Sequence, residues 1–196
     1  SFGCPLISNW AGMQGFVYGR SAPAEGFKWT YSYAFDEVQV ALNYVGTIKQ
    51  LQTNNKVGLL FGNDTDGNSW AQFNPPVFSG AGFQVEQTDQ YPPGQEDYSA
   101  QISQLKRAGC EALVASMVTP DFTNFWTQAH QQSFLPKITC VNKALTFPEA
   151  AAALGDLVLN VCCDGTWNPR SKWKDSLTGM SCAELTEEYE AYSGAQ

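Results

Sequence analysis

Residues 56–70 constrain this chain more than any other stretch, because a continuous apolar run passes abruptly into a polar loop. A run such as residues 57–61 is typical of a strand that is buried on both faces of a parallel sheet. The loop contains Gly62 and Gly67, which permit backbone conformations closed to other residues, together with several short polar side chains. In open α/β sheets, ligands bind at the carboxyl ends of the strands. The stretch therefore predicts a strand that leads into a binding site.

Strand-like and helix-like segments alternate along the rest of the chain. This alternation specifies parallel crossover units, and therefore a three-layer α/β sandwich with a mainly parallel sheet of about five strands. We expect the strand order 2-1-3-4-5, which brings residues 62–70 and the turn at 118–120 to one crevice at the topological switch. The four later strands are predicted at residues 83–87, 112–118, 138–141 and 157–161.

Capping patterns predict where the helices of this fold begin. A polar side chain before an apolar stripe of helical spacing accepts hydrogen bonds from the first backbone amides. Pro75 and Pro76 are expected to break or kink the helix after the loop, because proline lacks the amide and clashes with the preceding turn. The predicted caps are Asp36, Asp97, Thr119, Thr146 and Ser181. Two helices have stripes that should face inward: Phe122, Phe125, Trp126 and Ala129 in one, and Leu185 and Tyr189 in the last.

The charge balance and the missing motifs exclude several functions. The 196-residue chain has a net charge of −8, which would repel a nucleic-acid backbone. No apolar run approaches the roughly 20 residues that span a bilayer, so we expect no direct membrane insertion. The sequence has no P-loop, no G-x-S-x-G elbow and no G-x-G-x-x-G fingerprint, and its one histidine, His130, lies mid-helix. We therefore expect neither catalysis nor a cofactor.

The six cysteines form no C-x-x-C pair, which disfavours a zinc or other metal site. Their even number suits an oxidising compartment, but the sequence leaves their pairing open. Cys140 with either Cys162 or Cys163 is the pair to test first, because these residues lie on strands that are predicted to be neighbours.

The predicted crevice offers groups that suit reversible capture of a small polar solute. The loop after the first strand contributes short polar side chains, among them Thr65 and Asp66. Thr119 lies at a helix N-terminus, Lys143 supplies a cation, and Trp167 supplies an aromatic wall. A second role stays open for the two aspartates of the loop, which could instead stabilise a turn and cap the following helix. Lys143 could likewise be a solvated rim charge.

Several stretches resemble, in the same order, one family of transport proteins. Residues 57–67, VGLLFGNDTDG, resemble its apolar strand and D-x-x-x-G loop, and residues 91–102, YPPGQEDYSAQI, resemble its Y-x-P-G-x-x-D-F-S-A-Q-I segment. The strand at 112–118 follows as in the family. The family is the solute-binding proteins of ABC transporters of the branched-chain amino acid type, or extracellular ligand-binding receptors with the type I periplasmic-binding-protein fold. Further stretches look like one branch of it: residues 120–129, 143–148, 176–179 and 188–190.

The resemblance implies that the chain is part of a two-lobed protein. Family members have two α/β lobes joined by three crossings, so residues 35–196 would form the second lobe. Residues 1–34 would be an arm and first hinge crossing, the remnant of a missing first lobe. The ligand contacts implied by position are Asp66, Val118, Thr119, Asn142 and Lys143, with Ser8, Asn9 and Trp10 from the side of the absent lobe.

The function implied by the resemblance is extracytoplasmic binding of a small polar organic solute, amino-acid-like or carboxylate-bearing, in the cleft between lobes. The solute would be delivered to the membrane permease of an ABC transporter, and the protein would be periplasmic or tethered at the cell surface. The chain departs from amino-acid binders at two positions. Those proteins often carry an aromatic residue in the first loop, where this chain has Asp66, and a carboxylate after the fourth strand, where it has Asn142 and Lys143. The reversed charge disfavours an α-amino-acid ligand.

Two other functions stay open at this point. One is a stand-alone flavodoxin-like sensor or enzyme domain, motivated by the same crevice and by the adjacent Cys162 and Cys163. The other is an interaction module that dimerises through the arm around Trp10.

Overall fold

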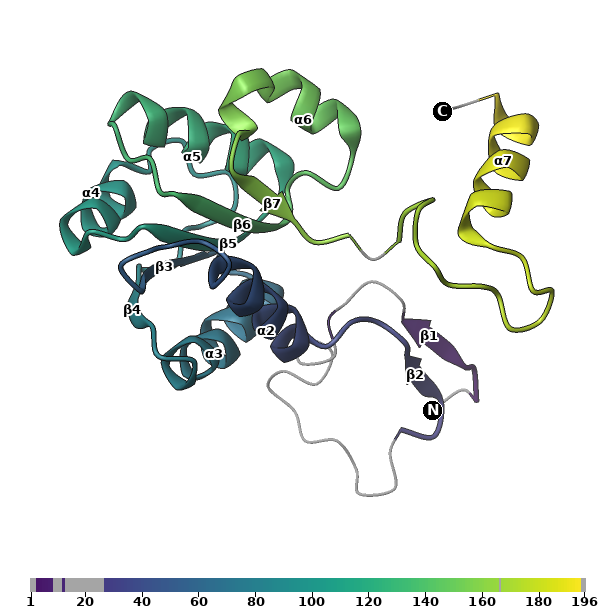
Figure 1. Cartoon of the computed structure of the whole chain (residues 1–196). Helices are drawn as coiled ribbons and strands as arrows, with labels where there is room; N and C mark the ends of the chain where they lie inside the picture. The colour runs from purple at the N-terminus through teal and green to yellow at the C-terminus, as the bar shows by residue number, and fades with distance from the viewer. Residues whose placement is uncertain (1–2, 9–11, 13–26, 166, 195–196) are drawn as a thin grey trace. The chain divides into compact units, whose positions relative to one another are not determined.

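The computed structural model of the chain describes residues 3–8, 12, 27–165 and 167–194. These residues fall into two units, of which the first ends at Asp164 and the second begins at Gly165. The first unit contains the main sheet and, near its start, two short parallel strands, β1 (Leu6–Ser8) and β2 (Thr30–Ser32). The described part of the second unit contains one helix, α7 (Cys182–Ser193) (Figure 1).

Five parallel strands form the main sheet, in the order β4-β3-β5-β6-β7. In chain order this is 2-1-3-4-5, so the predicted α/β topology is confirmed. The strands are β3 (Lys56–Phe61), β4 (Gln84–Gln87), β5 (Ala112–Met117), β6 (Ile138–Lys143) and β7 (Val161–Cys163). On one face of the sheet lie α2 (Glu37–Ile48) and α3 (Thr65–Gly80), and on the other α4 (Ser99–Ala108), α5 (Thr119–Gln131) and α6 (Pro148–Leu154) (Figure 1).

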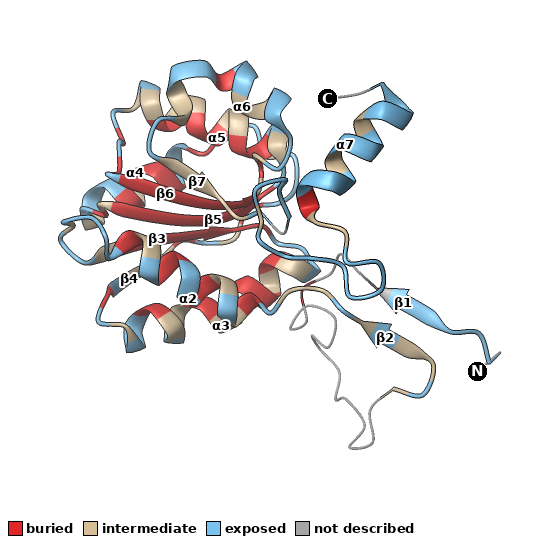
Figure 2. Cartoon of the chain, turned by 45° about the vertical axis from the view of Figure 1, so that its right-hand side comes forward, coloured by how far each residue is buried: buried red, intermediate tan, exposed pale blue. Residues whose placement is uncertain are grey.

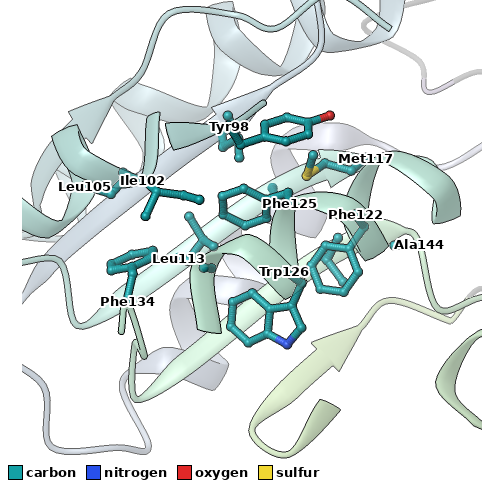
Figure 3. Packing of buried hydrophobic residues seen from close by; sticks show 14 of the residues in the cluster. Tyr98, Ile102, Leu105, Leu113, Met117, Phe122, Phe125, Trp126, Phe134 and Ala144 are labelled. Carbon is teal, nitrogen blue, oxygen red and sulfur yellow. The ribbon is translucent and has the colours of Figure 1, made fainter. Parts of the chain in front are cut away.

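Side chains of the central strands pack alternately against the two helical layers, as the pleat of a strand requires. On β3, Leu60 packs toward α4 and α5, whereas Leu59 and Phe61 pack toward α2 and α3. β5 is buried along its whole length (Figure 2), which explains its nearly continuous apolar sequence. The predicted core stripe of α5 is confirmed, and Figure 3 shows three of its rings inside the cluster: the buried residues are Phe122, Phe125, Trp126 and Ala129.

Two of the predicted helix caps are confirmed. Asp36 accepts hydrogen bonds from the amides two and three residues later, at 2.8 and 3.2 Å. Ser181 forms a capping box with Glu184 at the start of α7. The predicted cap at Asp97 is wrong by one residue, because Tyr98 is the N-cap of α4. The Asp97 carboxylate accepts a hydrogen bond from the backbone amide two residues later, at 2.8 Å.

Thr119 and Thr146 do not cap helices, contrary to prediction. The Thr119 hydroxyl donates to the carbonyl oxygen of Ala144 at 2.9 Å, and the Thr146 hydroxyl donates to the carbonyl oxygen of Lys143 at 2.8 Å. Neither α5 nor α6 has a side-chain cap hydrogen bond. Both hydroxyls instead close the loop that follows β6, because that loop brings carbonyl acceptors close to them.

The prolines of α3 do not end the helix, so of the two predicted alternatives, a break or a kink, the break is wrong. α3 continues through Pro75 and Pro76, although a proline in a helix interior costs about 3 kcal/mol or more. Trp70 before the prolines and Phe78 after them are fully buried and pack with the side chains of β3. This packing holds the helix together on both sides of the prolines. Because α3 already begins at Thr65, the polar loop after β3 is only residues 62–64.

The fifth strand is later and shorter than the predicted 157–161. Residues 155–158 form a 3-10 turn, and β7 begins at Val161. The carbonyl oxygen of Leu157 accepts a hydrogen bond from the indole of Trp126 at 2.6 Å, and Leu157 packs against the cluster that contains this ring. The apolar residues that suggested a strand therefore pack against the side chains of α5 instead.

The predicted inward stripe of α7 is also wrong. Leu185 and Tyr189 are 48% and 62% exposed, and Cys182 is the residue of this helix that is buried. The described part of the second unit provides no sheet or further helix that could cover an apolar stripe.

Asn74, on α3, has a buried side-chain amide without a hydrogen-bond partner among the described residues. An unpaired buried polar group costs about 1–3 kcal/mol. We therefore expect Asn74→Leu to raise the free energy of unfolding in urea by about 1 kcal/mol. The matched control is Asn142→Leu, which should lower this free energy because the Asn142 amide is bonded to Asp164. A loss of stability in both variants would contradict the prediction.

Candidate functional site

The carboxyl edge of the main sheet gathers the polar segments that follow its strands. β3, β5, β6 and β7 run in parallel, so their carboxyl ends meet at this edge. β3 leads into residues 62–64, β5 into Val118 and Thr119, and β7 into Asp164, while β6 ends with Asn142 and Lys143. The edge corresponds to the crevice predicted from the strand order.

Lys143 and Asp66 form an ion pair across this edge. Lys143 is the last residue of β6, and Asp66 lies in the first turn of α3, directly after β3. Because β5 lies between β3 and β6, the pair bridges the carboxyl end of β5. The two side chains are 31% and 25% exposed. The pair therefore holds a partly exposed cation and a partly exposed anion side by side at the carboxyl edge.

The backbone of Lys143 is strained. Its φ of 71° lies in the left-handed region, which costs a residue other than glycine roughly 1–2 kcal/mol. The turn is closed by Thr146, whose amide and hydroxyl both donate to the Lys143 carbonyl, at 3.2 and 2.8 Å. Backbone strain of this kind, maintained by the surrounding structure, is frequent at functional positions.

A hydrogen-bond chain holds the residue before Lys143. The Asn142 side chain is buried; its Nδ2 donates to Asp164 at 2.8 Å, and its Oδ1 accepts from the Ser116 hydroxyl at 3.5 Å. Asp164 also accepts from the Tyr44 hydroxyl at 2.8 Å. Burial first, and then the Asp164 carboxylate, raise the pKa of Tyr44 far above its usual range, so this hydroxyl stays a donor. The chain connects α2, β6 and the end of β7, and it orients Asn142.

The turn between β3 and α3 requires glycine at residue 67. A Cβ atom there would lie 2.0 Å from the carbonyl oxygen of Gly62, so no side chain fits. Asp64 caps α3, because its Oδ1 accepts from the Gly67 amide at 2.7 Å. The two aspartates of this segment therefore differ in their contacts. Asp64 caps the helix, which was the alternative to ligand contact, whereas Asp66 pairs with Lys143.

Six of the predicted site residues lie at this edge. Besides Asp66, Asn142 and Lys143, these are Thr65, Val118 and Thr119. Thr65 is exposed as the first residue of α3, and Val118 is 49% exposed at the N-cap of α5. Thr119 is half-buried, and its hydroxyl is already used by the loop after β6.

Of the other four predicted residues, one belongs to the second unit, one lies in β1, and two lie outside the described residues. Trp167 is 48% exposed and belongs to the second unit. Ser8 is the last residue of β1, where its backbone pairs with Ser32 of β2. Asn9 and Trp10 lie outside the described residues.

Sequence reasoning missed three members of the hydrogen-bond chain. Tyr44 lies on the apolar stripe of α2 and has the pattern of an ordinary core residue. Ser116 is a polar residue in a buried strand, and Asp164 directly follows the last strand. The position after a strand, which pointed to Asn142 and Lys143, could also have pointed to Asp164.

The described residues contain no group of three or more acidic, histidine or cysteine side chains that could hold a metal ion. Within the same part of the chain, every helix is too short or too polar to cross a membrane. A shallow depression is lined by Ala100, Ser103, Lys106 and Arg107 of α4. These four residues lie on the exposed face of α4, and none of them is a predicted site residue.

Residues 3–196 match the family described as periplasmic binding protein. Three solved structures are similar over almost the whole chain. The leucine binding protein LivK from Thermotoga maritima has a TM-score of 0.78 at 19% identity, with 98% of this chain and 51% of LivK covered. A branched chain amino acid ABC transporter protein from Thermus thermophilus with bound valine has a TM-score of 0.73 at 14% identity, covering 99% and 47%. A fatty acid ABC transporter substrate-binding protein from Thermomonospora curvata has a TM-score of 0.66 at 15% identity, covering 96% and 46%. The chain spans about half the length of each, and at these identities the likeness shows the fold alone.

Proposed function

The chain belongs to the periplasmic binding protein family, and on that premise we propose that it forms one lobe of an extracytoplasmic solute-binding protein. The family and the similar structures are solute-binding proteins of ABC transporters and not enzymes. Residues 35–196 are the second lobe of a two-lobed protein, and residues 1–34 are the arm and first hinge crossing. Hinge closure of the two lobes encloses the solute for delivery to an ABC permease.

Two observations support the division into lobes. The matches include 98–99% of this chain but only 47–51% of the leucine and branched-chain binding proteins to which it is similar. The arm also exposes apolar side chains: Leu6, Ile7, Tyr31 and Tyr33 are 55–69% exposed on or beside β1 and β2. Exposed apolar side chains that cluster in this way are typical of a surface that another part of the protein covers. In this proposal, a first lobe covers them.

The ligand class follows from Lys143, and this is the observation that carries the proposal. A lysine at the end of β6, partly exposed and beside the solvent-facing N-terminus of α5, offers an ammonium group to an anion. In this structure Asp66 pairs with the ammonium group. A solute carboxylate can replace Asp66 on Lys143, which keeps the ammonium paired while the cleft closes and water leaves. We therefore assign a small carboxylate-bearing organic solute.

An amino-acid-like solute is the second candidate, and the same ion pair favours it in a different way. A zwitterion would place its carboxylate on Lys143 and its ammonium group on Asp66. The two candidates differ in what they require of Asp66. A plain carboxylate competes with this side chain, whereas a zwitterion binds it.

The experiment that tests the function is mass spectrometry of solute carried through purification of the full-length parent from its native host. We expect a small organic acid that is released on denaturation and that raises the parent's melting temperature when added back. A retained flavin, or turnover in a screen of hydrolase and redox substrates, would contradict the proposal and favour the flavodoxin-like alternative.

A further inference from the structure

Cys140 and Cys162 face each other across two neighbouring strands. They are paired in the parallel register of β6 and β7, so their Cα atoms are opposite one another. Adjacent strands lie about 4.7–4.9 Å apart, and disulfides join Cα atoms that are roughly 4.4–6.8 Å apart. The backbone separation at this position is therefore one that a disulfide accepts.

Both side chains point to the same face of the sheet. Cys140 is fully buried in the cluster on the α2 and α3 side, and Cys162 packs against that same cluster from the sheet edge. Cys163, one residue further along β7, packs on the opposite face, and its thiol donates to the Asp164 carbonyl at 3.5 Å. The sheet thus decides between the two adjacent cysteines, because successive residues of a strand point to opposite faces.

No other cysteine of the first unit lies in the cluster that contains Cys140 and Cys162. All six cysteines lie among the described residues, and each is a free thiol in this structure. Cys110 packs in the cluster on the α4 and α5 side, Cys4 is exposed before β1, and Cys182 belongs to the second unit.

We propose that Cys140 and Cys162 form a disulfide that joins β7 to β6. A donor disulfide supplies the oxidising equivalents. The Cys162 thiolate attacks the donor disulfide and releases one donor thiolate. Cys140 then attacks the Cys162 sulfur of the mixed disulfide and releases the second donor thiolate. The two protein thiols lose two protons and two electrons, and the donor takes up both as two thiol groups. Cys162 reacts first because it is the more exposed of the pair.

The reactivity of the two thiols agrees with that order. Burial first, and then the neighbouring Cys162, raise the pKa of Cys140 to about 12, so the buried thiol is protonated at neutral pH. Cys140 therefore reacts second, when the mixed disulfide on Cys162 lies directly opposite it.

The disulfide would stabilise the arrangement of residues at the candidate site. β7 has only three residues and lies at the sheet edge, and it leads directly into Asp164, which holds Asn142. A covalent link just upstream of both residues would keep the ends of β6 and β7 in register. The setting for oxidation rests on the extracytoplasmic location proposed above, but the pairing itself rests on the sheet register.

The test uses the purified chain equilibrated in a glutathione redox buffer, acid-quenched, denatured and alkylated. Peptide mapping should find a Cys140–Cys162 link and four alkylated cysteines in the wild type, out of six in the sequence. Reduction should lower the melting temperature by about 5–10 °C in the wild type and in Cys163→Ser, and leave it unchanged in Cys162→Ser.

Alkylation of all six cysteines under oxidising buffer, or a link from Cys140 to Cys163, would overturn the pairing. Cell fractionation of the parent tests the location separately. A link that forms in the redox buffer, with a parent found in the cytoplasm, would support the pairing and overturn the proposed location.

Discussion

In isothermal titration calorimetry with the solute identified from the parent, we expect the 196-residue chain alone to bind at least about a hundredfold more weakly than the two-lobed parent. Small-molecule sites usually enclose about 70–90% of the ligand surface, and one lobe offers only one wall of such a site. A hundredfold loss corresponds to about 2.7 kcal/mol, which is a modest share of the contacts that a second wall would supply.

The control for this comparison is folding. Circular dichroism and urea unfolding of the chain alone should report a cooperative α/β domain, since the main sheet and both helical layers lie within the first unit. A folded chain that binds the solute as tightly as the parent would contradict the two-lobed proposal. It would favour a domain that works alone.

The second large effect is expected from Lys143→Met in the two-lobed parent. We expect the affinity for the carboxylate solute to fall about 10- to 100-fold, because hydrogen bonds to charged groups contribute roughly 1.5–3 kcal/mol. Methionine keeps the apolar stem and the same strained left-handed backbone of residue 143, so the loss reports the ammonium charge. The affinity is measured by calorimetry at fixed ionic strength.

Lys137→Met is the matched control. Lys137 also forms an ion pair, with Glu111 at 2.9 Å, but it precedes β6 and lies at the opposite edge of the sheet. Its substitution should leave solute affinity unchanged. An equal loss in both variants would mean that net charge, and not the site, sets the affinity.

Asp66→Asn decides between the two ligand classes. If the solute is a plain carboxylate, this variant should bind it more tightly, because Lys143 no longer pairs with Asp66. If the solute is a zwitterion, the variant should bind it more weakly, because the partner of its ammonium group is gone. Our proposal of a carboxylate solute is wrong if affinity falls.

Local patterns were enough to predict most of the fold. The run at residues 57–61 is apolar throughout because β3 is covered by helices on both faces, and the α5 stripe has helical spacing because one face of that helix meets the sheet. The apolar run and the helical stripe depend on neighbours along the chain, which a sequence displays directly. The strand order was an expectation for a sheet of parallel crossover units, and the structure confirms it.

Two of the errors share one cause, which is contact between residues that are distant in the sequence. α3 persists through two prolines because Trp70 and Phe78 are packed against β3. The apolar residues before β7 form no strand because Leu157 accepts the indole hydrogen bond of Trp126. No window of sequence around either segment contains the residue that decides its structure.

The sequence by itself therefore determined that the carboxyl edge of a parallel sheet carries Asp66, Asn142 and Lys143, because strand ends are readable as changes from apolar to polar residues. Only the tertiary structure decided what these residues do there. It paired Lys143 with Asp66 across the end of β5, and it joined Tyr44 to Asp164, 120 residues apart, to hold Asn142. It also separated Cys162 from Cys163 by the faces of the sheet. The physical reason is that sheet order and register set which side chains meet, and neither is a property of any single segment.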